Sequence, residues 1–106
     1  MQTMRKYNKL VRDRIPDIIK KQGQNPVTRV LDDNEYVEGL IDTLCEEIDA
    51  FDEDRNVEEM ADILEVLMAL ANALGISQQE LKRVRDQKAI SRGGFRKRIF
   101  LERVEE

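Results

Sequence analysis

Apolar side chains recur at helical spacing through the middle of the chain. In DDNEYVEGLIDTLCEEIDAFDED (residues 32–54) they return every three or four positions, as on one face of an amphipathic helix. The pattern predicts a helix here, capped by Asp33 or Asn34, and Gly39 weakens this helix without excluding it. The apolar positions on its predicted core face are Val37, Leu40, Ile41, Leu44, Ile48 and Phe51.

A second helical pattern follows after the turn EDRN. It runs from about Val57 to Leu74; Asn56 is a suitable capping residue, and Gly75 stands where a glycine commonly ends a helix. Because the connecting turn is short, the two helices are expected to pack antiparallel as a hairpin. The predicted core positions of this second helix are Met60, Ile63, Leu64, Leu67, Met68 and Ala71.

Shorter elements flank the predicted hairpin. IPDIIKKQG (residues 15–23) predicts a short helix, with Pro16 in its first turn and Gly23 at its end. SQQE (residues 77–80) matches a capping box and predicts a fourth helix that reaches about Ile90. The segment RGGF then breaks the pattern, and the tail RKRIFLERV fits either a short strand or a helical turn.

Length and composition agree with a small all-α fold. The 106 residues fit one domain, residues 1–106. The composition, with 38% charged and only 5% aromatic residues, suits helices better than a β-sandwich. A chain this short buries a modest core. We therefore expect two hairpins from two copies to complete a four-helix bundle, within a homodimer or homotetramer. Tyr7, Phe95 and Phe100 are too few for a base-stacking surface and are expected in the core.

The composition also excludes several classes of protein. The single cysteine, Cys45, cannot form an internal disulfide, and no Cys/His ligand set for zinc is present. No apolar run reaches the roughly 20 residues of a membrane span. The N-terminal MQTMRKYNKL lacks the apolar core of a signal peptide, so we expect a cytoplasmic protein. Direct nucleic-acid binding is not expected, because the net charge is −4 and no reader motif is present.

Charge is segregated along the chain. Residues 42–65 contain eleven acidic residues and one basic residue, whereas residues 5–14 contain five basic residues and one acid, and residues 88–103 six and one. A fold that joins these segments would surround carboxylates with a cationic rim, which suits a metal-bound polyanion such as a nucleoside triphosphate. The alternative is that opposite charges neutralise one another across the surface.

Three acidic residues stand at spacings that would bring them together in the hairpin. Glu59 and Asp62 are three positions apart and share one side of their helix. Glu47 flanks the apolar face of the preceding helix at a similar height, with Asp49 near the same level. Carboxylates this close repel unless a cation or a proton intervenes. Oxygen ligands without His or Cys suit Mg²⁺ or Mn²⁺; the alternative is a solvated acidic face.

The acidic pattern EEIDA…EEMAD resembles the paired motif of the MazG-like all-α nucleoside triphosphate pyrophosphohydrolases, which include dimeric dUTPases and phosphoribosyl-ATP pyrophosphohydrolase. That motif is E-E-x-x-E on one helix and E-x-x-D on the next. The segments YNKLVRDRIPDII, ADILEVLMAL and KAISRGGFRKRIFL resemble a small single-domain branch of the same superfamily and cover most of the chain.

The resemblance implies an oligomeric, Mg²⁺-dependent enzyme that hydrolyses a nucleotide to a monophosphate and pyrophosphate. House-cleaning of non-standard nucleotides is the role that it suggests. Glu46 and Glu47 match the first two acids of the motif, and Glu59 and Asp62 match its E-x-x-D pair. Ala50 stands where the relatives keep a third acid, and Asp49 points about 100° away around a helix. A non-catalytic nucleotide-binding or sensing protein of the same fold is therefore the alternative.

The hypothesis assigns each candidate residue a role. Glu47, Glu59 and Asp62 would hold Mg²⁺ or Mn²⁺, and Glu46 would orient or deprotonate the attacking water. Lys88 and Arg92 share one helix face and are candidates for phosphate contacts, with Lys9, Arg12 and Arg14 completing the rim. Gly93 and Gly94 would either admit a ligand close to the backbone or end the helix. The sequence names neither the base nor the sugar.

Overall fold

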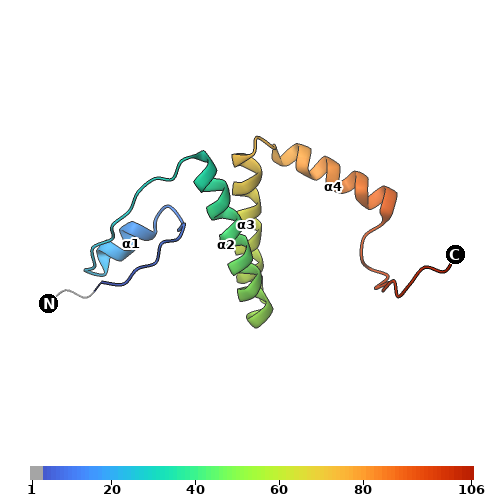
Figure 1. The fold of residues 1–106 in the computed structure, drawn as a ribbon, viewed down its shortest axis with the longest axis horizontal. Helices are drawn as coiled ribbons and strands as arrows, with labels where there is room; N and C mark the ends of the chain where they lie inside the picture. Colours follow the sequence, from blue (N-terminus) through green and yellow to red (C-terminus); the bar gives the residue numbers. More distant parts are fainter. Residues whose placement is uncertain (1–3) are drawn as a thin grey trace.

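The computed structural model describes residues 4–106 and contains four helices in this range. They are α1 (Ile15–Lys21), α2 (Asp33–Asp54), α3 (Val57–Ala73) and α4 (Gln78–Arg92). The described residues include no strand, so the tail after α4 is irregular rather than a strand or a helix. Helices α2 and α3 lie side by side and run in opposite directions (Figure 1). The predicted all-α class and the α2–α3 hairpin are confirmed.

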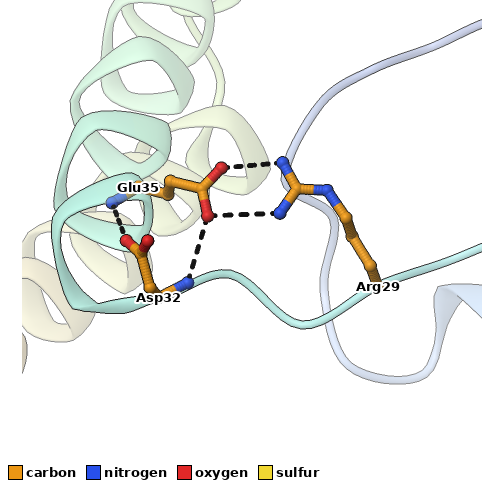
Figure 2. Close-up of polar contacts among 3 residues, drawn as sticks. All are labelled: Arg29, Asp32 and Glu35. Atoms are coloured by element: carbon orange, nitrogen blue, oxygen red, sulfur yellow. Dashed lines mark hydrogen bonds and ion pairs between the residues drawn. The ribbon is translucent and has the colours of Figure 1, made fainter.

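Helix α2 begins at a reciprocal cap one residue earlier than predicted. Asp32 Oδ1 accepts a hydrogen bond of 2.8 Å from the Glu35 N–H, and Glu35 Oε1 accepts one of 3.3 Å from the Asp32 N–H. Arg29 donates to both Glu35 oxygens, at 3.2 and 2.7 Å (Figure 2). The hydrogen bond from Arg29 is the main reason why the pKa of Glu35 falls to about 2. The cap is therefore Asp32, and Asp33 and Asn34 already lie in the first turn.

The remaining helix ends follow their local signals closely. Asn56 caps α3 by accepting a 2.9 Å hydrogen bond from the Glu59 N–H, as predicted. Ser77 accepts a 3.1 Å bond from the Glu80 N–H, but the Glu80 carboxylate pairs with Arg83, so only half of the predicted capping box forms. Gly75 and Gly93 follow α3 and α4 with φ of 74° and 82°, a region that favours glycine.

Gly39 lies where the N-terminal segment crosses α2. A Cβ atom at position 39 would lie 3.4 Å from Leu10 Cβ and 3.5 Å from Leu31 Cδ1. A methyl group there would already be in contact, so a larger side chain would push the crossing segment away from the helix. The helix-weakening glycine noted in the sequence thus permits the N-terminal segment to lie against the hairpin.

The two apolar faces of α3 have different surroundings. Within the described residues, the buried apolar positions are Leu40, Val66 and Ala71. Val66 was not among the predicted core positions. Met60, Leu64 and Leu67 were predicted to lie in the core. In a single copy all three are exposed, Met60 at 56% and Leu64 at 57%, so this part of the prediction is wrong for a single copy. The open side of α3 forms an apolar groove lined by Val57, Met60, Ala61, Ile63, Leu64 and Leu67.

The prediction that Tyr7, Phe95 and Phe100 lie in the core is also wrong for a single copy. Phe95 and Phe100 are 98% and 86% exposed, and Tyr7 is exposed too. Both phenylalanines follow α4, which turns by 111° from α3 and contacts α3 but not α2. Figure 1 shows α4 and the tail leading away from the hairpin.

The chain is extended for its length. Its principal dimensions are 69 × 31 × 27 Å and its radius of gyration is 18.9 Å, against about 13 Å for a compact chain of this length. No single helix in residues 4–106 is both long and apolar enough to cross a membrane; α3 and α4 meet the length and composition requirement only as a pair with a sharp bend.

Candidate metal centre

Three carboxylates converge between α2 and α3. Glu47 comes from α2, Glu59 and Asp62 come from α3, and one oxygen of each lies within 4.8 Å of the others. All three residues are half-buried. Glu59 and Asp62 point toward α2 because they share one side of α3 with Val66, which is buried at the hairpin interface. Asp62 therefore lies one turn before Val66, and Glu59 two turns before it, on the same face of α3.

A guanidinium from the N-terminal segment reaches this acidic cluster. Arg12 Nη2 donates a 2.6 Å hydrogen bond to Asp62 Oδ1, across fifty positions of sequence. The crossing of Leu10 over Gly39 brings Arg12 to this place. One guanidinium offsets only one of three carboxylate charges, so the cluster keeps an excess of negative charge.

The surroundings of the cluster shift the pKa of Glu47. Its pKa is raised above the ordinary glutamate value, first by partial burial and then by the negative charges of Asp62 and Glu59. Arg12 acts in the opposite direction and does not cancel these effects. Glu47 therefore keeps its proton to a higher pH than a free glutamate, and a cation at the cluster would favour release of that proton.

The donor set fits a hard divalent cation. All three side chains offer carboxylate oxygens. The single cysteine of the chain, Cys45, is exposed and is not part of this cluster. Mg²⁺ takes about six oxygen ligands at about 2.1 Å and commonly keeps several waters. Three protein carboxylates would leave positions for water and for phosphate oxygens.

The other acidic candidates lie outside the cluster. Glu46 is exposed next to Glu47, and Asp49 is exposed on another side of α2. Ala50, one turn after Glu47, is half-buried and offers no ligand atom. The departure from the E-E-x-x-E pattern thus leaves three carboxylates at the centre.

The cationic candidates divide into two groups. Arg12 is at the cluster, and Lys9 is exposed three residues earlier in the same segment. Lys88 and Arg92 are exposed on α4, which leaves the hairpin. A single copy therefore brings Glu47, Glu59, Asp62 and Arg12 together but not Lys88 or Arg92. Sequence reasoning missed the roles of Leu10 and Gly39, although a glycine inside a strong helix pattern was a signal of close approach.

Comparison with known proteins adds little to this geometry. No family model matches the chain, and no solved structure matches it. An uncharacterized protein of Mycolicibacterium smegmatis is 51% identical over 39 residues, which are 37% of this chain and 40% of that protein. The match thus spans well under half of either chain and carries no activity.

The raised pKa of Glu47 gives a pH-dependent prediction for the metal-free protein. A raised carboxyl pKa contributes stability below the ordinary glutamate pKa, and this contribution is lost as the pH rises through the raised value. Glu47→Gln removes the ionised form, so we expect a higher melting temperature than wild type at neutral pH without metal. The difference should shrink at acidic pH. Thermal unfolding in a chelator measures the two melting temperatures, and the exposed Asp49→Asn variant is the control. Equal melting temperatures for Glu47→Gln and wild type at neutral pH would contradict the proposed destabilisation by ionised Glu47.

Proposed function

We propose that this chain is a Mg²⁺-dependent nucleoside triphosphate pyrophosphohydrolase of the MazG-like type. It would cleave between the α- and β-phosphates and release a nucleoside monophosphate and pyrophosphate, with non-standard nucleotides among its substrates. The observation that carries the proposal is the approach of Glu47, Glu59 and Asp62 to within 4.8 Å of one another. These are the motif acids that the resemblance assigns to the metal.

Each residue at the cluster has a proposed role in this reaction. Bound Mg²⁺ supplies positive charge against the triphosphate oxygens and lowers the pKa of a bound water. Glu47, Glu59 and Asp62 would hold the ion, and Arg12, once released from Asp62, could pair with a phosphate oxygen. Exposed Glu46 can accept a proton from the attacking water. A new bond forms from water oxygen to the α-phosphorus, the α–β bridging bond breaks, and pyrophosphate leaves with its electron pair.

A four-helix bundle is part of the same proposal. The groove along α3 is apolar, and α3 carries apolar residues on two faces, which is typical of a helix covered from both sides. A second hairpin packed on this groove would cover Met60, Leu64 and Leu67. The interface would leave the acidic face between α2 and α3 open to substrate, because Glu59 and Asp62 point toward α2.

A non-catalytic nucleotide-binding protein is the second candidate. Ala50 favours this candidate, because the enzymes that the chain resembles have an acid at this position. Without it, the cluster consists of three carboxylates instead of four. Such a protein would bind triphosphates with Mg²⁺ and release no pyrophosphate. Incubation with a panel of ordinary and damaged triphosphates, read by pyrophosphate release and by equilibrium binding, separates the two candidates.

Asp62→Asn tests the proposed enzyme most simply. It keeps the size of the side chain and removes the charge that both Arg12 and the metal would use. We expect hydrolysis to fall by at least about 100-fold, because loss of a metal contribution of several kcal/mol corresponds to this factor or more. Asp49→Asn, which alters an exposed acid outside the cluster, should keep activity. Wild-type activity in Asp62→Asn would refute the assigned ligands, and binding without hydrolysis in the wild type would favour the second candidate.

Arg12→Ala separates the two proposed roles of the guanidinium. Removing a cation that competes for Asp62 should tighten Mg²⁺ binding about two- to fivefold, the scale of one exposed ion pair. The same change removes a phosphate contact and should raise KM for the nucleotide. Isothermal titration with Mg²⁺ and steady-state kinetics measure the two effects. Exposed Arg5→Ala, in the same N-terminal segment, is the matched control; Mg²⁺ binding weakened by Arg12→Ala would contradict the competition.

A further inference from the structure

The N-terminal part of the chain forms a loop whose two ends meet on α2. Leu10 and Leu31 are both half-buried, and they lie 3.4 and 3.5 Å from the position that a Cβ atom at Gly39 would occupy. The loop between them contains α1 and leads away from the hairpin (Figure 1). Its base, where Leu10 and Leu31 lie against Gly39, is therefore the point at which the loop is attached to the hairpin.

One arginine on each side of this base pairs with the hairpin. Arg29, on the α2 side, donates to both oxygens of Glu35 at 3.2 and 2.7 Å, and Glu35 also belongs to the cap of α2 (Figure 2). Arg12, on the N-terminal side, donates a hydrogen bond of 2.6 Å to Asp62 of the acidic cluster. Glu35 is not one of the three cluster residues. A cation at the cluster would therefore compete with Arg12 and leave the pair between Arg29 and Glu35 in place.

The residues between the base of the loop and α1 are held by few contacts. We call residues 10–14 the strap. Leu10 is half-buried, whereas residues 11–14 are exposed. The side chain of Arg12 is 59% exposed although it pairs with Asp62. Because exposed ion pairs contribute little free energy, the Arg12 end of the strap can separate from the hairpin while Leu10 stays packed.

A divalent cation changes how strongly the cluster attracts Arg12. Glu47, Glu59 and Asp62 carry at most three negative charges, and Mg²⁺ would offset two of them. The guanidinium would then be attracted by at most one net charge, and it would share the Asp62 oxygens with the metal. Linkage is reciprocal, so the factor by which Arg12 weakens Mg²⁺ binding is also the factor by which Mg²⁺ weakens the contact of Arg12.

We propose that the strap is a latch that Mg²⁺ opens: metal at the acidic cluster releases Arg12 from Asp62, and the strap moves about the contact of Leu10 with Gly39 without leaving α2. The inference rests on the metal site of the proposed function, but not on hydrolysis. It extends the competition at Asp62 to the position of a whole segment. In the metal-free protein the guanidinium occupies the acidic cluster, and in the loaded protein it is available to an anionic ligand.

Limited proteolysis with trypsin measures the release, because trypsin must bind the guanidinium of Arg12 in its specificity pocket before it cleaves there. The rate of cleavage after Arg12 is divided by the rate after Arg96, an exposed residue of the tail. We expect saturating Mg²⁺ to raise this ratio about two- to fivefold, the scale of one exposed ion pair. Asp62→Asn should raise it similarly without metal, and Mg²⁺ should then add nothing. An unchanged ratio, either in wild type with Mg²⁺ or in Asp62→Asn without it, would overturn the latch.

Substitutions at Gly39 test whether the position of the strap affects the metal site. The branches of Gly39→Val would meet Leu10 and Leu31 and should lift the strap, whereas the methyl group of Gly39→Ala lies at ordinary contact distance. Isothermal titration should show Mg²⁺ binding about two- to fivefold tighter in Gly39→Val, as for loss of one exposed ion pair, and unchanged in Gly39→Ala. In an Arg12→Ala background Gly39→Val should add nothing, because the guanidinium that it displaces is absent. Folded Gly39→Val without tighter binding, or tightening that persists in the Arg12→Ala background, would contradict the proposal.

The results separate this inference from the proposed enzyme. If Mg²⁺ binds in the titration but leaves cleavage after Arg12 unchanged, the latch is wrong and the metal site stands. If the wild type releases no pyrophosphate but Mg²⁺ accelerates this cleavage, the enzyme is wrong and the latch stands. If Mg²⁺ does not bind at all, both the metal site and the latch are wrong.

Discussion

Repulsion among three half-buried carboxylates is the constraint around which the structure is built. Glu47, Glu59 and Asp62 lie on the faces by which α2 and α3 meet, where apolar side chains would pack more favourably. Arg12 offsets one of the three charges, and the raised pKa of Glu47, caused first by partial burial and then by the neighbouring carboxylates, shows that ionisation is disfavoured there. If the proposed metal site is correct, a bound cation should stabilise this helix pair by mass action.

The same constraint explains why the apolar residues of α3 extend around the helix. The face toward α2 carries acids in its first half, so only Val66 and its neighbours near the middle and end can pack there. The remaining apolar residues, Met60, Leu64 and Leu67, lie on another side of α3 and are exposed in a single copy. The acidic cluster and the proposed oligomer interface thus lie on different faces of one short helix. The bend after α3 directs α4 and the tail away from the hairpin.

The sequence predicted what depends on local spacing and missed what depends on distant contacts. Helix bounds followed from apolar periodicity and caps, and the side shared by Glu59 and Asp62 followed from their separation by three. The buried face of α3 was assigned to Met60 and Leu64 instead of Val66. Because α3 has apolar residues on two faces, their periodicity does not show which face packs against α2. The ion pair from Arg12 to Asp62 depends on the N-terminal segment crossing at Gly39, a contact that no spacing within one segment encodes.

We propose that the hairpin itself forms one divalent-metal site per chain. Titration of the protein with Mn²⁺, followed by the loss of the free-ion signal in electron paramagnetic resonance, counts such sites directly. The account predicts one bound ion per chain that Mg²⁺ displaces, and no bound ion at that position in a folded Asp62→Asn variant. Folded wild-type protein that leaves the whole Mn²⁺ signal free, or Asp62→Asn protein that binds as the wild type does, would contradict it.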